Sequence, residues 1–211
     1  MDKTDLATRQ KILDAALKQF AHCGYAGASV QAIVDSARVT KPTLYYYFPD
    51  KAKLFQALVH QAHDERYSLL QEAVHRAPDV KEQLVEILTV MFDFLRGNRE
   101  LMRLAFATAF AAPGEVPEKM GVSEKCDRNF EFVHKIIKRG LKEKIFDARF
   151  DSRDLAYGFY GQINSYSMAH LIMPDKKLNR ATAERIVELF LAGAGAKIKK
   201  NAVKKIEVKK T

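Results

Sequence analysis

Apolar residues recur at spacings of three and four along almost the whole chain, which is the pattern of amphipathic helices. The first stripe comprises Leu6, Ile12, Leu13, Ala16, Leu17 and Phe20. Gly24 predicts the end of this helix near Cys23, because glycine adopts the left-handed backbone that closes many helices without steric cost. No stretch shows sustained alternation of apolar and polar residues, so the sequence predicts an all-α fold without sheets.

Residues that cap helix starts divide the rest of the chain. Ser, Thr, Asp and Asn side chains accept hydrogen bonds from the free N–H groups of a first helical turn. The predicted caps are Ser29, Thr40, Asp50, Asp79, and Asp151 or Ser152. With glycines and prolines as stops, they predict about nine helices in total, the later ones at about residues 30–36, 41–47, 51–75, 80–97, 98–112, 123–144, 152–173 and 179–194.

The predicted helices group into two modules and a tail. Residues 1–49 form an N-terminal three-helix unit, residues 50–196 form a larger C-terminal helical bundle, and residues 197–211 form a Lys-rich tail. A unit as small as the first buries little apolar surface by itself. We therefore expect the helix at 51–75 to pack against the small unit and to link the two modules.

Composition fits a soluble globular protein in a reducing cytoplasm. The chain has 211 residues, of which 47% are hydrophobic and 29% are charged. Its two cysteines, Cys23 and Cys126, are too few for a disulfide framework. The polar N-terminus lacks the pattern of a signal peptide, and the longest apolar run is too short to span a bilayer. We therefore expect a cytoplasmic protein with no membrane partner.

The net charge of +9 is concentrated at the C-terminus. Residues 197–211 contain seven lysines and one glutamate, a balance of +6, which leaves +3 for the preceding 196 residues. A basic tail attracts any polyanion without selecting one. The tail is therefore either a solvated chain end or a functional arm, and a nucleic-acid partner must be argued from other residues.

Residues 30–47 have the helix-turn-helix pattern of a short helix, a three-residue turn and a second short helix. In such motifs the second helix presents side chains to base edges, while flanking groups hold phosphates. Lys41 can donate to guanine, and Pro42 and Thr43 can contact thymine methyl groups. The three tyrosines at 45–47 point about 100° apart on a helix, so they cannot share one buried face, and their hydroxyls can reach phosphates.

Two further features complete this motif. Leu44 and Phe48, at i and i+4, are the better core pair of the second helix. Lys51 lies in the first turn of the next helix, where its charge and the exposed N–H groups would form an anion site.

The segment from Lys11 to Phe55 resembles the DNA-binding region of TetR/AcrR-type transcriptional regulators. The residues that carry the resemblance are Ile12 through Phe20, Gly24, Tyr25, Ser29, Ile33, Ala37, Val39, Thr40, Lys41, Thr43, Leu44, Tyr45, Tyr46, Phe48, Lys51, Leu54 and Phe55. The overall length and the number of predicted helices are also similar to those of this family.

The resemblance implies roles for individual residues. It implies base-facing roles for Gln31, Lys41, Pro42, Thr43 and Tyr45, phosphate contacts for Tyr46, Tyr47 and Lys51, and a place for Thr40 at the start of the recognition helix. Two positions depart from the usual pattern, since Arg38 stands where glycine is common and Val34 stands where alanine is usual. Pro42 also replaces a common glycine, but some family members carry proline there. A left-handed backbone at Arg38 would cost about 1 kcal/mol.

The bundle segment carries no catalytic or cofactor-binding signature such as G-x-S-x-G, H-E-x-x-H or a P-loop, so we expect neither an enzyme nor a cofactor. His60 and His63 have a spacing that metal ligands use, but no third ligand is evident, and we expect no metal. Cys126 has no nearby cysteine or obvious base in the sequence, which favours a packing role over a redox role.

Aromatic residues and methionines are frequent in the predicted helices between residues 80 and 173. They could form an ordinary bundle core. The resemblance implies instead that the bundle encloses a cavity for a small-molecule effector, and such cavities are mostly apolar. The residues expected to face it are His63, Tyr67, Met91, Phe106, Phe130, His134, Gln162 and Tyr166.

The last two predicted helices carry apolar stripes, at Leu155, Phe159, Ile163 and Tyr166 and at Ile186, Val187, Phe190 and Leu191. Such stripes either cover one core or meet a second subunit. The resemblance implies the latter, a homodimer through an isologous four-helix interface. A two-fold dimer places two recognition helices in successive major grooves, so the expected partner is double-stranded, palindromic operator DNA.

The leading hypothesis is a DNA-binding transcriptional repressor that is released from its operator when a small, largely apolar ligand binds the bundle. The helix at 51–75 would couple the two modules, and the ligand can act only through its differential affinity for two conformers. Two alternatives remain open. One is a DNA-bound scaffold whose bundle recruits a protein partner and binds no small molecule, and the other is an enzyme built on a helical bundle.

Overall fold

The computed structural model describes residues 3–112, 114–117, 120, 122–174 and 177–195. This part of the chain contains nine α-helices and confirms the predicted all-α fold. The helices are α1 (Lys3–Gly27), α2 (Val30–Ala37), α3 (Lys41–Tyr47), α4 (Lys51–Arg76), α5 (Val80–Gly97), α6 (Arg99–Ala109), α7 (Val122–Lys142), α8 (Ser152–Ile172) and α9 (Arg180–Ala194). An isolated β-bridge pairs Phe146 with Gly195. The predicted Lys-rich tail at 197–211 lies outside the described residues.

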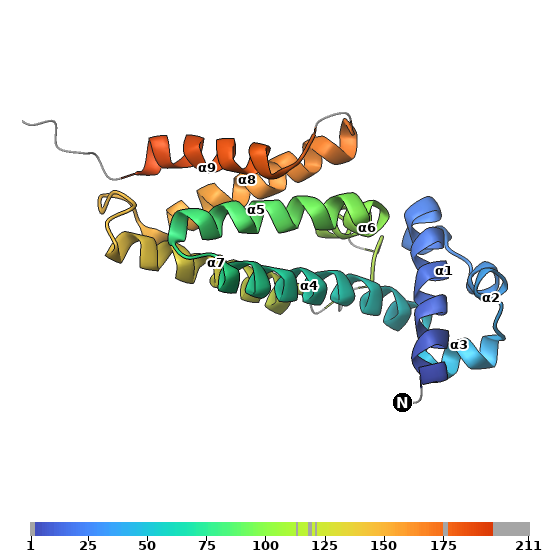
Figure 1. Cartoon of the computed structure of the whole chain (residues 1–211). Helices are drawn as coiled ribbons and strands as arrows, with labels where there is room; N and C mark the ends of the chain where they lie inside the picture. Colours follow the sequence, from blue (N-terminus) through green and yellow to red (C-terminus); the bar gives the residue numbers. More distant parts are fainter. Residues whose placement is uncertain (1–2, 113, 118–119, 121, 175–176, 196–211) are drawn as a thin grey trace, which may run out of the picture.

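The small N-terminal unit stands at one end of an elongated molecule (Figure 1). Helix α1 runs across the end of the bundle, and α2 and α3 lie on its far side. Gly24 has a φ of 68° inside α1, so the helix is kinked there and continues to Gly27. The predicted helix end near Cys23 is thus a kink, which glycine permits because it has no Cβ.

Local capping explains where most helices begin. Side chains accept hydrogen bonds from first-turn N–H groups at the predicted caps Thr40, Asp50, Asp79 and Asp151, and also at Asn179. Ser29 has the extended backbone of an N-cap, but its side chain makes no capping hydrogen bond. These bonds satisfy N–H groups that have no partner within the helix.

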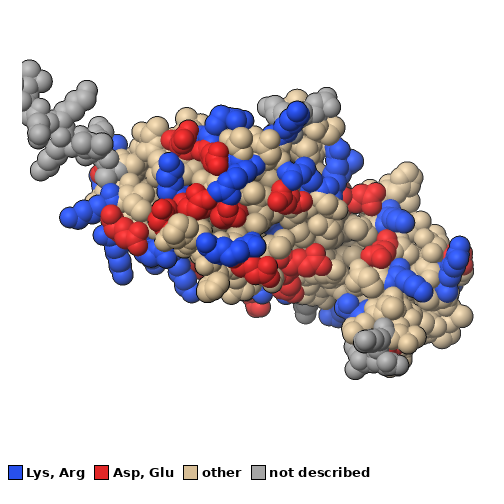
Figure 2. All heavy atoms as spheres, viewed as in Figure 1, with Lys and Arg blue, Asp and Glu red and all other residues tan. Residues whose placement is uncertain are grey.

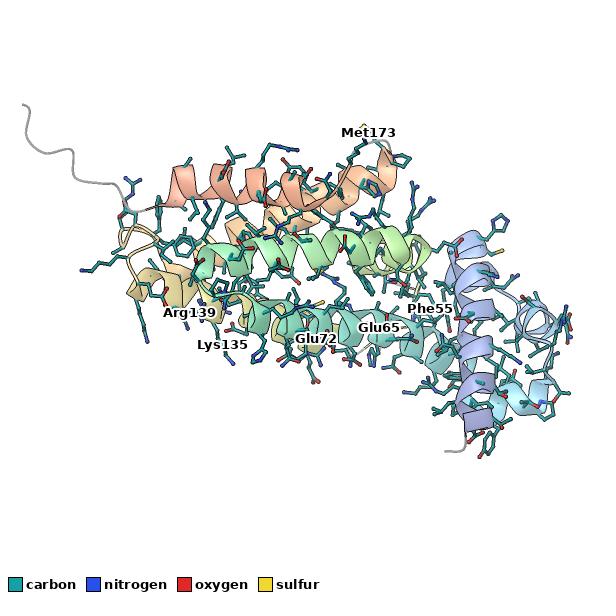
Figure 3. The ribbon with its side chains drawn as sticks, viewed as in Figure 1. Phe55, Glu65, Glu72, Lys135, Arg139 and Met173 are labelled. Atoms are coloured by element: carbon teal, nitrogen blue, oxygen red, sulfur yellow. The ribbon has the colours of Figure 1, made fainter. Side chains whose placement is uncertain are left out.

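The described chain has two hydrophobic cores, and α4 contributes to both. The core of the small unit contains Ile12, Leu13, Phe20, Ile33, Leu44 and Phe48 together with Leu54, Phe55, Leu58 and Val59 of α4 and Leu104 of α6. Figure 3 labels Phe55 where α4 meets α1. Its ring lies edge-on to Phe20, with the ring centroids 4.9 Å apart. The core of the small unit therefore extends past residue 49 into the first turns of α4.

Helix α5 occupies the centre of the bundle, in contact with α4, α7, α8 and α9 (Figure 1). Its Leu84, Leu88 and Phe92 are completely buried. In α7, Gly140 allows Phe146 to pack closely, because a Cβ at this position would lie 2.4 Å from the Phe146 ring. The close contact with Phe146 therefore requires glycine at position 140, although glycine lowers the intrinsic stability of a helix.

Candidate DNA-binding surface and bundle interior

One side of helix α3 is fixed to the small unit, and the other side faces solvent. Leu44 and Phe48, the predicted core pair, are only 0% and 3% exposed. At the start of the helix, the Thr40 hydroxyl accepts a hydrogen bond from the Thr43 N–H at 3.3 Å and lies 2.8 Å from the Thr43 hydroxyl. The helix is therefore held at both ends, which presents its remaining side chains in a defined orientation.

Most of the predicted DNA-contacting side chains are accessible on α3 and the adjoining α2. The exposed ones are Gln31, Thr40, Lys41, Pro42, Tyr45 and Tyr46, while Thr43 is half-buried. Tyr46 is 76% exposed and Tyr45 is 44% exposed. Gln31 Nε2 donates to Asp35 Oδ1 at 2.8 Å along α2. The structure thus brings these residues to one accessible region.

Tyr47 has a different place from the one predicted. Its hydroxyl donates to the Asp5 carboxylate near the start of α1, and its ring is half-buried and edge-on to Tyr46 at 5.0 Å. The hydrogen bond to Asp5 raises the pKa of Tyr47. This hydroxyl joins α1 to α3, and the prediction that it contacts a phosphate is not supported by the structure.

Lys51 also differs from its predicted phosphate role. Its Nζ donates to the backbone carbonyl oxygens of Tyr25, Ala26 and Ala28, at 2.9, 3.3 and 3.2 Å. The same ammonium lies 4.7 Å from the centroid of the Tyr25 ring. An ammonium has three N–H donors, so these carbonyls leave none for a phosphate. Lys51 instead holds the start of α4 to the end of α1.

The turn between α2 and α3 contains a residue in an unfavourable backbone conformation. Arg38 has a φ of 55° and a ψ of 47°, the left-handed conformation considered for this position. Together with Lys11, Lys18 and Asp14 of α1, it lines a surface hollow of about 390 Å³. Lys11 and Lys18 were not among the residues predicted to contact DNA, although their spacing of two helical turns places both on one side of α1. Three cations and one acid therefore lie beside the turn that leads into α3.

The distribution of charge over the surface is uneven. On the face shown in Figure 2, Asp and Glu side chains gather among Lys and Arg over the bundle, and fewer acidic side chains are visible on the small unit. On that unit, the Arg9 guanidinium lies 5.1 Å from the centroid of the Phe48 ring. A low density of acids reduces the repulsion that a polyanion would meet.

A second hollow lies between the small unit and the bundle. It has a volume of about 410 Å³. Phe20 and Tyr25 of the small unit and Phe55 of α4 line one side, and Arg103 and Leu104 of α6 contribute to the other. The sequence did not predict this hollow, because it depends on how α1 meets α6 in three dimensions.

The residues predicted to face a ligand cavity lie within the bundle, but the two hollows described above contain none of them. His63, Met91 and His134 are buried, while Tyr67, Phe106, Phe130, Gln162 and Tyr166 are half-buried. The Phe130 ring packs between α7 and α8, with its centroid 4.5 Å from that of Tyr157 and 6.0 Å from that of Tyr160. The ligand cavity in the bundle therefore stays a prediction.

His134 is occupied by contacts within the protein. Its Nδ1 lies 3.1 Å from Glu131 Oε2, and its Nε2 lies 2.9 Å from Ser152 Oγ at the start of α8. Both ring nitrogens are used, so His134 has no polar atom left for a ligand. The structure gives this residue the role of joining α7 to α8 in place of the predicted ligand contact.

Among the described residues, three polar side chains of the bundle have a buried atom without a hydrogen-bond partner. These atoms are His63 Nδ1, Arg66 Nε and Gln162 Oε1. Arg66 was not predicted from the sequence. Burial and the nearby Arg66 charge lower the pKa of His63 to about 4, so the ring is neutral at pH 7. Such atoms are unusual, because most buried polar groups are paired.

The expectation that Cys126 has no base nearby is wrong. His63 Nε2 lies 4.0 Å from Cys126 Sγ, although 63 residues separate them in sequence. Partial desolvation raises the pKa of the Cys126 thiol. The imidazole therefore does not produce a thiolate at neutral pH, and the pair has no sign of redox activation.

The stripes predicted to meet a second subunit fill the core of the protomer itself, so this prediction is wrong in its choice of face. Leu155, Phe159, Ile163, Ile186, Val187 and Phe190 are buried, and Leu191 is half-buried. The Phe159 and Phe190 rings meet between α8 and α9 with their centroids 5.5 Å apart. Other apolar residues face outward, namely Met168, Ile172 and Leu189, which are 40%, 71% and 66% exposed.

Neither a metal site nor a membrane-spanning helix occurs in the ranges that the structure describes. Within those ranges, no group of three or more His, Cys, Asp and Glu side chains is placed to hold a metal ion. None of the described helices has both the length and the apolar character of a membrane span.

The sequence is similar to known transcriptional regulators. Residues 12–58 match the profile of the family described as bacterial regulatory proteins, tetR family. The HTH-type transcriptional regulator AcrR of Shigella flexneri is 26% identical over 198 residues, which cover 87% of this chain and 89% of AcrR. The HTH-type transcriptional activator FasR of Mycolicibacterium smegmatis is 29% identical over 127 residues, which cover 59% of this chain and 58% of FasR.

The fold is shared with a solved structure. The transcriptional regulator FadR from Bacillus subtilis in complex with stearoyl-CoA superposes with a TM-score of 0.74 at 22% sequence identity, covering 87% of this chain and 98% of the FadR chain. The matched segment 12–58 contains the helix-turn-helix motif and the turns of α4 that complete its core. From the sequence match and the structure together, the chain belongs to the TetR family of DNA-binding transcriptional regulators, which are not enzymes.

Proposed function

We propose that this protein is a repressor that binds a palindromic operator as a homodimer and leaves it when a ligand binds the bundle. The observation that carries the DNA-binding part is the exposed side of α3, where Lys41, Tyr45 and Tyr46 are presented by a helix whose other side is buried. A helix of this kind fits the major groove of B-DNA. Lys41 donates to guanine, and Pro42 and Thr43 contact thymine methyl groups.

Phosphate contacts would set the position of the small unit on DNA. Tyr46 is the most exposed of the three adjacent tyrosines and donates its hydroxyl to a phosphate. Lys11, Lys18 and Arg38 surround the hollow beside the α2–α3 turn and attract the DNA backbone. Tyr47 and Lys51 support this surface from within, because both hold other elements of the small unit in place.

Two observations support a ligand in the bundle. FadR, which has a similar fold, was solved in complex with stearoyl-CoA. In the present chain, α4 and α8 contribute three buried polar atoms without a partner. A bound molecule that supplies the missing hydrogen bonds would account for them, because an unpaired buried polar atom is costly. We infer a ligand that is largely apolar and carries at least one polar group.

Helix α4 would transmit ligand binding to the small unit. Leu54 and Phe55 in its first turns belong to the core of the small unit, while His63 and Arg66 lie further along the same helix, inside the bundle. Lys51 holds the start of α4 to α1. A ligand that displaces α4 would therefore move α1 to α3 with it, and would change the separation of two recognition helices in a dimer.

We propose that the outward faces of α8 and α9 form the dimer interface. Met168 and Ile172 of α8 and Leu189 of α9 are exposed apolar residues. Gly158 and Gly161 are exposed on α8 at helical spacing from Met168, and glycines let a partner helix approach closely. Exposed apolar side chains that gather on one surface support a protein partner there.

The test is binding to the DNA upstream of this protein's own gene, at two salt concentrations and with random-sequence competitor present. A palindromic footprint that resists the competitor is expected. Weak, salt-sensitive binding to all sequences would contradict the proposal, since phosphate attraction alone behaves in this way. Stearoyl-CoA is then added to the complex. Release of the operator supports the ligand-responsive repressor, while an unchanged footprint together with a bound partner protein supports the scaffold.

A further inference from the structure

One arginine of the bundle is almost fully buried, and it forms no ion pair with the carboxylates that the structure describes. Arg66 of α4 is only 9% exposed. Its Nε has no hydrogen-bond partner, and none of the described carboxylates forms an ion pair with it. A guanidinium group carries a positive charge. Burying such a charge is costly unless a partner compensates it, so an anionic partner for Arg66 would stabilise the protein.

The acids closest to Arg66 in the sequence are engaged elsewhere. The Asp64 carboxylate pairs with Lys125 at 2.6 Å and with Arg128 at 3.0 Å. The Glu65 carboxylate accepts a hydrogen bond from Gln61 Nε2 at 2.6 Å. Both acids lie on the more exposed side of α4, away from the buried Arg66. The counter-ion for Arg66 is therefore not supplied by its own helix.

His63 lies one turn before Arg66 on the same face of α4. It is 7% exposed, and its Nδ1 is unpartnered. The Arg66, Lys125 and Arg128 charges contribute to lowering the pKa of this imidazole, after burial itself. The surroundings of His63 are thus both dry and electropositive. An imidazole with an unpartnered Nδ1 and a guanidinium with an unpartnered Nε therefore lie one turn apart on the buried side of α4.

Aromatic residues neighbour the unpartnered polar groups of the bundle. Asn129 Nδ2 of α7 donates to the His63 carbonyl oxygen at 3.4 Å, and Phe130 is the next residue. In α8, Gln162, with its unpartnered Oε1, is one turn before Tyr166. The Tyr166 ring lies 6.4 Å from the Phe92 ring of α5, and both belong to the core of the bundle.

We propose that Arg66 binds the anionic head group, a carboxylate or a phosphate, of a bundle ligand whose remaining part is apolar. This inference rests on the proposed ligand-binding function and specifies its chemistry. The planar guanidinium can hold either oxyanion through two parallel hydrogen bonds, and the neutral His63 can donate a further one. A neutral ligand would leave the Arg66 charge uncompensated, and a cationic ligand would be repelled by it.

The experiment compares three probes with the same twelve-carbon chain: dodecanoate, dodecyl phosphate and dodecanol. Binding to the full-length protein is measured by isothermal titration calorimetry, below the concentration at which each probe forms micelles. Arg66→Met removes the charge and retains an unbranched apolar side chain. Arg76→Met is the matched control, because Arg76 is an exposed arginine in the last turn of the same helix. The two anionic probes distinguish a carboxylate site from a phosphate site.

We expect the wild-type protein to bind one or both anions about 10- to 100-fold more tightly than dodecanol. Arg66→Met should lose this preference and keep its affinity for dodecanol, while Arg76→Met keeps the preference. Without ligand, Arg66→Met should unfold at the same temperature as the wild type or higher, because an uncompensated buried charge has been removed. A purely structural arginine would instead lower that temperature.

The inference is overturned if the wild type binds dodecanol as tightly as the anions, if Arg66→Met keeps the preference, or if none of the three probes binds. Release of the operator is followed with the same probes. Equal release by dodecanol and dodecanoate would leave the ligand-responsive function intact and reject the role of Arg66. Anion binding that depends on Arg66 without any release of the operator would support the site and reject the proposed response.

Discussion

The Lys51 ammonium at the start of α4 lies 2.9 Å from the Tyr25 carbonyl oxygen and 4.7 Å from the centroid of the Tyr25 ring. The Tyr25 ring in turn packs edge-on against Phe55, with the centroids 5.1 Å apart. One lysine and two aromatic rings thus join the end of α1 to the first turns of α4. Any movement of α4 in the bundle acts directly on the helix that supports the recognition surface.

Lys51→Met should therefore weaken the fold of the small unit without removing a phosphate contact. We expect the free energy of unfolding to fall by about 1–3 kcal/mol, because three backbone carbonyls lose a charged donor. The dependence of DNA affinity on salt should keep its slope, whereas loss of a phosphate contact reduces the slope by about 0.9. Lys53→Met, at an exposed position of the same helical turn, is the control for both measurements.

Arg38→Gly should stabilise the protein by about 1 kcal/mol, because glycine adopts a φ of 55° without the steric cost that a Cβ imposes. Urea denaturation measures this difference. Arg38→Ala keeps the Cβ and should leave the stability close to that of the wild type. A loss of stability in Arg38→Gly would show that contacts of the arginine side chain outweigh its backbone strain.

Lys41→Ala should reduce operator affinity by about 1–3 kcal/mol and relax specificity at one base pair, if the ammonium reads a guanine. Fluorescence anisotropy with a set of operators substituted one position at a time measures both effects. Tyr46→Phe, which removes a hydroxyl proposed to contact a phosphate, should weaken all these operators by the same factor. The same uniform loss in Lys41→Ala would assign Lys41 to the DNA backbone.

His63 makes the stability depend on pH in a window set by its lowered pKa. The folded protein holds the ring neutral down to about pH 4, while the unfolded chain takes up a proton near pH 6.5. Stability is therefore lost as the pH falls from 6.5 to 4, by up to about 3 kcal/mol. His63→Leu removes this contribution. The unfolding free energy of the wild type minus that of the variant, measured across this range, should decrease as the pH falls. A difference that stays constant with pH would contradict the assignment.

Leu189→Glu should dissociate the dimer if the outward face of α9 meets its equivalent in a partner. A carboxylate buried there without a counter-ion costs about 3–5 kcal/mol. Sedimentation velocity should show monomers at concentrations where the wild type is dimeric. Lys135→Glu is the control, because Lys135 of α7 lies on the opposite side of the bundle from Met173 at the end of α8 (Figure 3). Equal dissociation of both variants would place the interface elsewhere.

Helix positions and the DNA-binding motif were predictable because their signals are local. Thr40, Asp50, Asp79 and Asp151 cap helices with hydrogen bonds to N–H groups two or three residues away. Leu44 and Phe48 were correctly assigned to the core from their spacing alone. The left-handed backbone of Arg38 was considered from its position in the motif, and the structure has it. In each case the residues that determine the local structure lie within a few positions of it in the sequence.

Long-range partners were not predictable in the same way. Tyr47 and Asp5 are 42 residues apart in the chain, and Lys51 and Tyr25 are 26 residues apart. The helical period shows which residues share a face of a helix. It does not show whether that face packs in the protomer's core or against a second subunit, because both need apolar side chains. For this reason, the stripes that include Phe159 and Phe190 were assigned to a dimer interface, although they fill the protomer's own core.

The sequence by itself determined that this chain is helical, where its helices begin, and that the segment from Lys11 to Phe55 resembles the DNA-binding region of one family. Tertiary structure alone decided which polar groups are paired. Lys51 and His134 have partners within the protein, while Arg66 is buried without one. The physical reason is that periodicity and capping act along the chain, whereas desolvation and charge pairing depend on side chains that folding brings together from distant segments.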